Sequence, residues 1–395
     1  MTDPLESYRA ALDGLKSAHR LRRTRVFDPG APGVLNASSN DYLGLSRHPA
    51  VIARACEYAE AWGTGSASSR LICGTLPPHA ALEEKLARLK GSETALVMGP
   101  GFLTNASVIA ALLEKAALGA EPLVFADKLN HASMHEGCRL SGARQIRCRH
   151  LDLDHLESQL KKHADKPGPR FIMSETVFSM DGDRADVPAL AELAARFGAF
   201  LYLDEAHAVG VLGHKGLGLA AGVAVERGLV MGTFSKALGS YGAYVCCGRD
   251  VREYLVNRAP GFIFSTALPP PSLGAADAAL DLIPGMERDR KALLIQARRL
   301  RDRLAEAGLD TGLSSTQIVP VTVGEEARAL DAMRALEAEG ILAVAVRPPT
   351  VPPGSSRIRL SLTALHSPAD VDRLAEAVTR LVPAGNGRNR HRGGK

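Results

Sequence analysis

Strand-like and helix-like segments alternate along the chain from about residue 80. The short apolar or β-rich runs are TALVMG, PLVFAD, RQIRCRH, RFIMSET and AFLYLDEA. Helical stretches separate most of them, among them LTNASVIAALLEKAA, LDHLESQLKKHA and VPALAELAARFG. Such alternation favours an α/β domain in which helices cover a mostly parallel sheet. Because functional groups in such sheets gather where the strands end, we expect a site at the carboxyl ends of the strands.

A second pattern begins near residue 273. Long helical stretches run to about residue 308, and they are followed by the strand TQIVPVTVG, a helix over 326–339, the strands ILAVAVR and RIRLSL, and a last helix. This order predicts a smaller α+β C-terminal domain. At the other end of the chain, the helical spacing of apolar residues predicts an amphipathic helix that carries Leu5, Tyr8, Leu12 and Leu15.

The chain has 395 residues, which is too long for one simple core. We therefore expect an N-terminal helical arm over 1–38, a large domain over 39–272 and a small domain over 273–384. The basic tail over 385–395 is expected to be disordered. No internal repeat of solenoid period is present.

Composition narrows the possible functions. Hydrophobic residues make up 46% of the chain and charged residues 23%, as in an ordinary globular protein. No uninterrupted apolar run approaches about 18 residues, and the N-terminus lacks the pattern of a secretory signal, so we expect no membrane span and a cytoplasmic location. The six cysteines show neither CxxC spacing nor a cluster with histidine. This favours reduced thiols over disulfides or a metal site.

The positive charge of the chain is local. The tail GNGRNRHRGGK holds four basic residues and no acidic one, which accounts for all but one of the +5 net charges. The body of the chain is therefore close to neutral. Neither zinc-finger spacing nor an RNA-binding signature is present, so a nucleic-acid-binding protein is disfavoured in spite of the pI of about 8.9.

Chemically versatile residues follow several of the predicted strands. The strand AFLYLDEAH ends in Asp204, with His207 three residues further on. The strand GLVMG leads into a loop of small residues that holds Thr233, Ser235 and Lys236. A third strand, RFIMS, is followed by a segment that contains Glu175, Ser179 and Asp181.

A lysine, a strand-end carboxylate and several hydroxyl groups together indicate pyridoxal 5′-phosphate (PLP) chemistry. A lysine amine forms a Schiff base with the cofactor aldehyde, and an aspartate pairs with the pyridinium nitrogen, so Lys236 and Asp204 are the candidates for these roles. The hydroxyl groups of Thr233 and Ser235 can donate to the phosphate. The backbone at the helix start after GPGF can do the same.

Each of these features also has an ordinary structural explanation. A serine–lysine pair is commonly found on a surface, and an aspartate that ends a strand is often a turn residue. His131 and His207 could be hydrogen-bonded structural histidines, and GPGF could be a plain turn. The joint order of the features and their place at strand ends favour the catalytic interpretation.

The segments LYLDEAHAVGVLG and GTFSKALGSYGAYV resemble the α-oxoamine synthase family of PLP enzymes. Further similar segments follow in the family's order, from about residue 5 to 382: NASSNDYLGLSRHP, GTGSASSRLICGT, LNHASMHEG, TVFSMDGD, FSTALPP and RPPTVPPGSSRIRLSLTALH. The resemblance implies the aspartate-aminotransferase-like PLP fold. This fold has a large domain with a seven-stranded, mostly parallel sheet and a smaller α+β domain.

The resemblance also implies roles for individual residues. Lys236 resembles the Schiff-base lysine, Asp204 the partner of the pyridine nitrogen, His207 the donor to the ring hydroxyl and His131 the imidazole that stacks on the ring. Other positions resemble cofactor contacts: Gly101, Phe102, Ser179 and Thr233. Ser265 and Thr266 resemble residues that reach the phosphate of a partner subunit, which implies a homodimer with shared active sites.

Substrate contacts are implied in the same way. Asn40, Glu175, Arg22 and Thr350 resemble substrate-side positions. Arg347 and Arg359 are both candidates for holding an amino acid carboxylate, for which arginine has a suitable bidentate fork. We favour Arg359, although the sequence does not separate the two.

Members of this family condense an amino acid with an acyl thioester, delivered by coenzyme A or a carrier protein, and release CO₂. The segments RPPTVP, SSNDYLGL and VFSMDGD are similar to those of one branch of the family, whose enzymes convert alanine to 8-amino-7-oxononanoate in biotin synthesis. ASSRLICGT also resembles the glycine C-acetyltransferase branch, so a glycine-using enzyme stays open. An aminotransferase, which shares the lysine and aspartate, is a more distant alternative.

Overall fold

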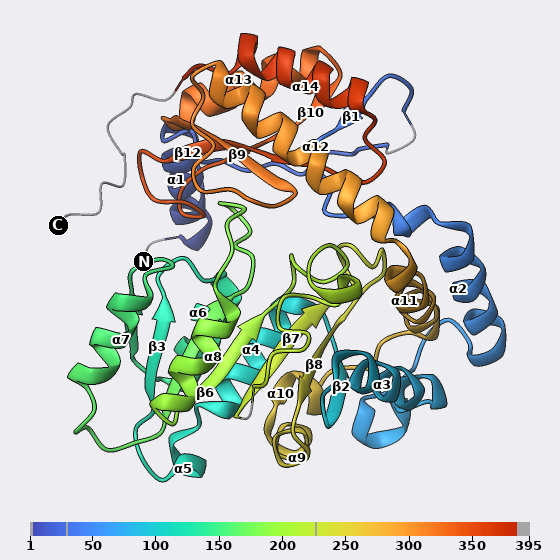
Figure 1. Cartoon of the computed structure of the whole chain (residues 1–395), viewed down its shortest axis with the longest axis vertical. Coiled ribbons are helices and arrows are strands. Elements are labelled where there is room, and N and C mark those ends of the chain that lie inside the picture. Colours follow the sequence, from blue (N-terminus) through green and yellow to red (C-terminus); the bar gives the residue numbers. More distant parts are fainter. Residues whose placement is uncertain (1–2, 29–30, 226, 385–395) are drawn as a thin grey trace. The chain divides into compact units, whose positions relative to one another are not determined.

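The computed structural model describes residues 3–28, 31–225 and 227–384; the basic tail lies outside the described residues (Figure 1). Two compact units are present. The larger comprises Asn40–Ser179 and Asp183–Lys291, and the smaller comprises the residues up to Ser39, the short piece Met180–Gly182 and the residues from Ala292 onward.

A seven-stranded sheet forms the centre of the larger unit, in the order β2-β8-β7-β6-β5-β3-β4 (Figure 1). All neighbouring pairs are parallel except those of β8, which runs antiparallel to both β2 and β7. This confirms the predicted α/β class and the mostly parallel sheet. The strands are β2 (Thr94–Met98), β3 (Leu123–Asp127), β4 (Gln145–Cys148), β5 (Arg170–Glu175), β6 (Phe200–Asp204), β7 (Gly228–Thr233) and β8 (Ala243–Cys247).

Both faces of this sheet are covered, which explains why its strands read as nearly continuous apolar runs. Successive side chains of a strand point to opposite faces. Phe171 and Met173 of β5 therefore pack in one buried cluster, together with α4 (Gly101–Leu112) and α6 (Ala132–Ser141). Ile172 packs in another cluster, with α7 (Leu153–Lys162) and α8 (Val187–Arg196).

The remaining helices of the larger unit are α2 (Pro49–Trp62), α3 (Pro77–Lys90), α5 (Lys115–Leu118), α9 (Arg249–Arg258), α10 (Pro260–Ile263) and α11 (Pro270–Leu282). Helices α2 and α11 pack closely because Gly274 brings the two backbones together. A Cβ atom at this position would lie 2.5 Å from the Arg54 carbonyl oxygen. The small residues of α11 thus serve helix packing rather than chemistry.

One segment, Gly101–Leu118, has the length and apolar composition of a membrane span. In the structure it is divided between α4 and α5, with Leu113 and Glu114 between them. Half of the segment is buried, and α4 packs in the core against the sheet. These features are those of a core helix.

The smaller unit contains a three-stranded antiparallel sheet in the order β11-β12-β9, as predicted for an α+β domain. Its strands are β9 (Ile318–Gly324), β11 (Val344–Val346) and β12 (Ser356–Ser361), and its C-terminal helices are α12 (Glu287–Glu306, which begins in the larger unit), α13 (Glu326–Ala338) and α14 (Pro368–Leu381). The sequence ILAVAVR, expected as one strand, forms two. β10 (Ile341–Leu342) pairs with β1 (Leu35–Asn36), whereas β11 pairs with β12, so the run changes partners at Ala343.

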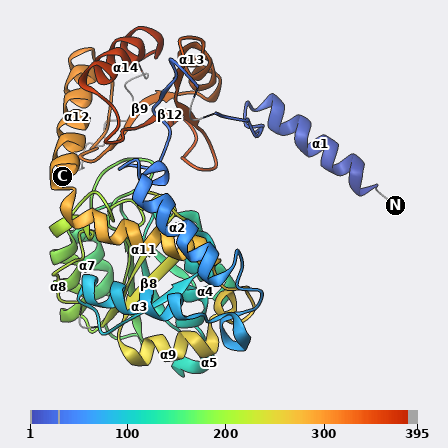
Figure 2. The ribbon, with the colours of Figure 1, turned by 90° about the vertical axis from the view of Figure 1, so that its right-hand side faces the viewer.

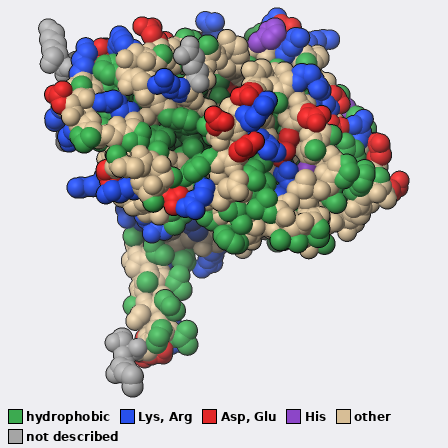
Figure 3. All heavy atoms as spheres, turned by 90° about the horizontal axis from the view of Figure 1, so that it is seen from below, with side chains coloured by type: hydrophobic (Ala, Val, Ile, Leu, Met, Phe, Trp, Pro, Cys, Tyr) green, Lys and Arg blue, Asp and Glu red, His purple; other side chains and the backbone are tan. Residues whose placement is uncertain are grey.

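The N-terminal helix α1 (Pro4–Ser17) has no buried residue, and its apolar side chains are exposed. Asp3 caps it by accepting the Leu5 N–H at 3.0 Å. Its exposed residues include Leu5, Tyr8, Leu12 and Leu15. The helix stands away from the strands of its own unit in Figure 2, and hydrophobic side chains are visible along it in Figure 3.

Candidate active site

The carboxyl ends of the parallel strands bring the predicted catalytic groups to one edge of the sheet. Glu175 ends β5 and Asp204 ends β6, and the two are directly paired in the register of these strands. Thr233 ends β7, the next strand in the sheet, and leads to Lys236. The sheet therefore gathers groups that lie more than 50 residues apart in the chain.

Asp204 is held as a hydrogen-bonded carboxylate in a buried position, with only 4% of its surface exposed. One oxygen accepts the Ala206 N–H at 2.8 Å, and the other accepts the Asn105 side-chain amide at 2.7 Å. The Asn105 oxygen in turn accepts the Tyr202 hydroxyl at 2.7 Å. A buried carboxylate needs hydrogen-bond partners, and this network supplies them at this edge of the sheet.

The same network extends to His131, which caps the N-terminus of α6. The Asn105 amide also donates to Ser133 Oγ at 2.9 Å, and Ser133 Oγ lies 2.7 Å from His131 Nδ1. Phe102 meets the imidazole edge-on, with ring centroids 6.4 Å apart. Desolvation lowers the pKa of His131, while the nearby carboxylate of Asp204 acts in the opposite direction.

The amine of Lys236 meets the imidazole of His207. Lys236 Nζ lies 2.8 Å from His207 Nε2, and the other ring nitrogen lies 2.7 Å from the hydroxyl of the fully buried Tyr42. Tyr42 donates in turn to the side chain of Asn40 at 3.0 Å. This chain of contacts fixes the orientation of the His207 ring and brings Asn40 into the same network as Lys236.

A group of donors suited to an anion lies beside this chain. The hydroxyls of Thr233 and Ser235 are 2.7 Å apart, and Gly101 opens α4, whose first backbone N–H groups have no partner within the helix. A Cβ atom at Gly101 would lie 3.2 Å from Met231 Cε, a tight contact with a flexible side chain. Hydroxyls and a helix N-terminus are the groups that proteins commonly use to hold phosphate.

Glu175 is 2% exposed, and its Oε1 has no hydrogen-bond partner. Burial raises the pKa of Glu175 well above its ordinary value, and the charge of Asp204 raises it further. The neighbouring strand ends therefore carry two acids in different surroundings. Both oxygens of Asp204 accept hydrogen bonds, whereas Glu175 is disposed to keep its proton.

The remaining predicted residues of the larger unit lie in loops. Ser179 is buried in the hairpin that follows β5. Thr266 forms an isolated antiparallel bridge with Ser69, and Ser265 precedes it. Phe264, the next residue back, is 81% exposed.

Four predicted substrate residues belong to the smaller unit. Arg22 donates to Thr350 at 3.3 Å, and Arg347 donates to the carbonyl oxygen of His19. Arg359 of β12 is buried and donates to Ser361 Oγ at 2.7 Å. Arg22, Thr350 and Arg347 thus connect the arm with the loop after β11, while Arg359 belongs to the sheet.

A buried ion pair supports the loop between Asp204 and His207. Lys90 at the end of α3 binds the carboxylate of Glu205, and their side chains are 4% and 0% exposed. Glu205 also accepts the Ala220 N–H at 2.8 Å. Burial acts to lower the pKa of Lys90, but the charge of Glu205 outweighs it and the pKa is raised.

The sequence did not single out the residues that complete the site: Tyr42, Asn105, Ser133 and Tyr202. Asn105 and Tyr202 lie inside apolar runs. A polar side chain in such a run must be buried, and this is the sequence signal that could have identified the two residues. Tyr42 and Ser133 lie within the quoted motifs SSNDYLGL and LNHASMHEG. Their partners become visible when distant segments are brought together.

Among the described residues, no group of three or more His, Cys, Asp or Glu side chains could hold a metal ion. Two cavities of about 140 and 380 Å³ are lined by neither Lys236 nor Asp204. The strand-end cluster is the candidate active site because it brings an amine, imidazoles and buried carboxyl groups together.

Comparison with known proteins places this cluster in a family. The family described as "Aminotransferase class I and II" matches residues 32–378, so the chain belongs to this family. A protein of Paramagnetospirillum magneticum called putative 8-amino-7-oxononanoate synthase is 58% identical over 94% of this chain and 97% of its own length. An 8-amino-7-oxononanoate synthase of Gluconacetobacter diazotrophicus is 52% identical over 94% and 96% of the two chains.

The fold is also similar to that of solved enzymes. A serine palmitoyltransferase of S. paucimobilis, solved with PLP and myriocin bound, shares 26% identity at a TM-score of 0.87, over 96% of this chain and 98% of that one. An 8-amino-7-oxononanoate synthase of Francisella tularensis, 24% identical, has the same fold at a TM-score of 0.75, over 89% and 98% of the two chains.

The raised pKa of Glu175 predicts a pH-dependent cost to stability. A carboxyl group that is more basic in the folded than in the unfolded chain destabilises the fold increasingly as pH rises above its unfolded pKa of about 4.3. Glutamine cannot ionise. We therefore expect Glu175→Gln to gain stability relative to the parent between about pH 5 and pH 8, as measured by chemical denaturation.

The matched control is Glu287→Gln, a substitution at an exposed glutamate of α12 whose pKa is lowered by Lys291. Its stability relative to the parent should not rise over the same range. A difference for Glu175→Gln that stays constant or shrinks with pH would contradict a protonated Glu175.

Proposed function

We infer that the chain condenses L-alanine with a pimeloyl thioester, with loss of CO₂, to give 8-amino-7-oxononanoate for biotin synthesis. It is a PLP-dependent acyltransferase. The observation that carries the chemistry is the buried, hydrogen-bonded Asp204 at the strand edge that also presents the Lys236 amine. The choice of substrate rests on relatives at 48–58% identity over 91–98% of the chain.

The side chains at the strand ends are chemically suited to bind PLP. Asp204 supplies a carboxylate for the ring nitrogen, Lys236 an amine for the aldehyde, and the α4 N-terminus donors for the phosphate. Thr233, whose hydroxyl donates to the Gly242 carbonyl oxygen, is a further proposed contact. When bound, PLP stores the electron pair released at the α-carbon of the amino acid. Ser179 and the ring of His131 complete the proposed set of cofactor contacts.

Lys236 is the proposed base that would take the α-proton of the amino acid at Nζ. His207 holds this nitrogen at 2.8 Å, which limits the positions that the amine can adopt. An amine must be neutral to accept a proton.

We propose that Arg359 binds the carboxylate of the amino acid. It is buried, and arginine forms two parallel hydrogen bonds to a carboxylate. Arg347, which donates to the His19 carbonyl oxygen, is the other candidate for this role. His131 is the proposed donor to the acyl carbonyl, and Asn40, Glu175, Arg22 and Thr350 are further proposed substrate contacts.

A glycine-using synthase of the same fold is the second candidate function. The segment ASSRLICGT, which resembles the glycine C-acetyltransferase branch, favours it. Carbon–carbon bond formation would need the same lysine and aspartate. The two functions differ in the room needed for one methyl group and in the length of the acyl chain.

We further propose a homodimer whose sites draw on both subunits, in the cytoplasm. Leu71, Ile72 and Phe264 of the larger unit are 48%, 79% and 81% exposed, and Ser69 and Thr266 link their two segments. Large apolar side chains that gather on a surface commonly mark an interface. All six cysteines are free thiols, which is consistent with a reducing compartment.

The choice of substrate is tested by a paired assay. The chain is given alanine with a pimeloyl thioester and, separately, glycine with acetyl-CoA, and kcat/KM is compared. We expect a clear preference for the first pair. Because one methyl group discriminates by only about 1–3 kcal/mol, weak glycine turnover is compatible with the proposal. Preference for glycine and acetyl-CoA would favour the second candidate.

The role of Lys236 is tested by spectroscopy. The purified chain should show the visible absorbance of lysine-linked PLP, and Lys236→Ala should lose it because no other amine replaces the side chain. Lys215→Ala, in the loop that follows His207, serves as the control and should retain the absorbance. An unchanged spectrum in Lys236→Ala would refute the assignment.

The proposed interface is tested at Phe264. Phe264→Glu places a charge in the apolar patch and should shift the assembly from dimer toward monomer in light scattering, with loss of activity at low protein concentration. Leu365→Glu, at a residue of the smaller unit that is 73% exposed, should leave the dimer intact. A fully active monomer would contradict shared sites.

A further inference from the structure

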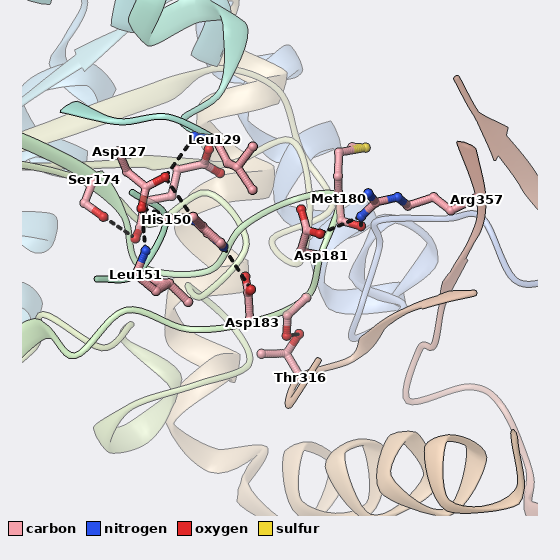
Figure 4. A network of polar contacts seen from close by, with 12 residues as sticks. Asp127, Leu129, His150, Leu151, Ser174, Met180, Asp181, Asp183, Thr316 and Arg357 are labelled. Atoms are coloured by element: carbon pink, nitrogen blue, oxygen red, sulfur yellow. Dashed lines mark hydrogen bonds and ion pairs between the residues drawn. The ribbon is translucent and has the colours of Figure 1, made fainter. Parts of the chain in front are cut away.

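His150 is a buried histidine that no step of the proposed reaction uses. It follows β4, and its side chain is 14% exposed. Nδ1 lies 2.9 and 3.1 Å from the two carboxylate oxygens of Asp127, and Nε2 lies 2.9 Å from Asp183 Oδ2 (Figure 4). The ring also packs edge-on against Phe178, with centroids 4.4 Å apart. The imidazole thus bridges two acids that lie 56 positions apart in the sequence.

Each acid organises a loop that carries a proposed cofactor contact. Asp127 ends β3, accepts the Leu129 N–H at 2.8 Å, and accepts the Asn130 N–H on its carbonyl oxygen. The next residue is His131. Asp127 therefore shapes the turn that presents His131 at the start of α6.

Asp183 closes the hairpin that presents Ser179. Its carbonyl oxygen accepts the Phe178 N–H at 3.1 Å, and Val177 and Arg184 form a bridge beside it. The hairpin begins at Thr176, whose N–H donates to the carbonyl oxygen of Asp204 at 2.9 Å. Ser179 is thus held in a turn that is attached directly to the strand end of Asp204.

The two acids depend on His150 to different degrees. Asp127 also accepts the N–H groups of Leu129 and Leu151. Asp183 is 4% exposed, and its second oxygen, Oδ1, has no hydrogen-bond partner. Removal of the imidazole would therefore leave a buried carboxylate poorly satisfied on the Ser179 hairpin, which is costly enough to move the loop.

We propose that His150 is a positioning residue that fastens the His131 turn to the Ser179 hairpin and so holds the PLP-binding groups in place. The proposal rests on the proposed function of the site. Only the doubly protonated imidazole can donate to both carboxylates at once. Burial acts to lower the pKa of His150, but the hydrogen bonds to Asp127 and Asp183 outweigh it and raise the pKa to about 9, so the ring keeps both protons at neutral pH.

We call the contacts of His150 with Asp127 and Asp183 the clamp. It is tested with three variants, each purified with PLP, stripped of the cofactor and then titrated with PLP. In His150→Gln, both N–H groups lie on one nitrogen, which cannot take the place of two ring nitrogens on opposite sides of the imidazole. We therefore expect PLP affinity to fall by about tenfold or more and the visible circular dichroism of the bound cofactor to change. In Asp183→Asn, the amide oxygen still accepts from Nε2, so affinity should stay within about threefold of the parent. His163→Gln is the matched control.

His163 packs edge-on against Phe125 and bonds the Gln159 carbonyl, within its own helical region. His163→Gln should leave affinity and circular dichroism as in the parent. Equal losses in His150→Gln and His163→Gln, or parental values in His150→Gln, would overturn the clamp. Equal losses in Asp183→Asn and His150→Gln would also overturn it, because the hydrogen bond would then not be what positions the loops.

Failure of the proposed function is distinguishable from failure of the clamp. If the function is wrong, the parent chain itself will not bind PLP through Lys236, and both proposals fall. If the clamp alone is wrong, the parent binds PLP, but the variants do not show the expected differences in PLP affinity and circular dichroism.

Discussion

The buried carboxylate of Asp204 is the constraint around which the site is arranged. A charge with almost no contact with water must be satisfied by hydrogen bonds, and the chain supplies them from Asn105 and the Ala206 N–H. Asn105 comes from the apolar helix α4 and is itself fixed by Tyr202. Asn105 and Tyr202 thus serve one requirement, to satisfy the carboxylate at the end of β6. The further contact of Asn105 with Ser133 connects them to His131.

The parallel sheet explains why these groups lie at its edge. Both faces are buried under helices, so the strand interiors are apolar and offer no place for reactive groups. Only where the strands end does the backbone turn toward solvent, and there Glu175, Asp204 and Thr233 occupy neighbouring positions. The antiparallel strand β8 extends the sheet at the other side of β7. It brings Gly242 to the Thr233 hydroxyl, which donates to its carbonyl oxygen at 2.9 Å.

Most of the sheet, and the cluster around Lys236, could be predicted from the sequence because apolar periodicity and strand-end polarity are local signals. The strand β8 was not singled out, since its residues AYVCC follow a glycine-rich loop directly. The division of ILAVAVR into β10 and β11 depends on pairing with Leu35–Asn36, more than 300 residues away. Tyr42 and Asn105 were missed for the same reason. Their function lies in contacts that no local pattern records.

Four acids at this edge differ in their hydrogen-bond partners. Asp204 accepts from two neutral donors, the Asn105 amide and the Ala206 N–H. Asp127 and Asp183 both bind the imidazole of His150 and serve structure. Glu175 has neither kind of partner at Oε1 and is driven toward its neutral form. Asp204 thus holds its carboxylate with hydrogen bonds from neutral donors, at the position where a cationic ring nitrogen would be stabilised.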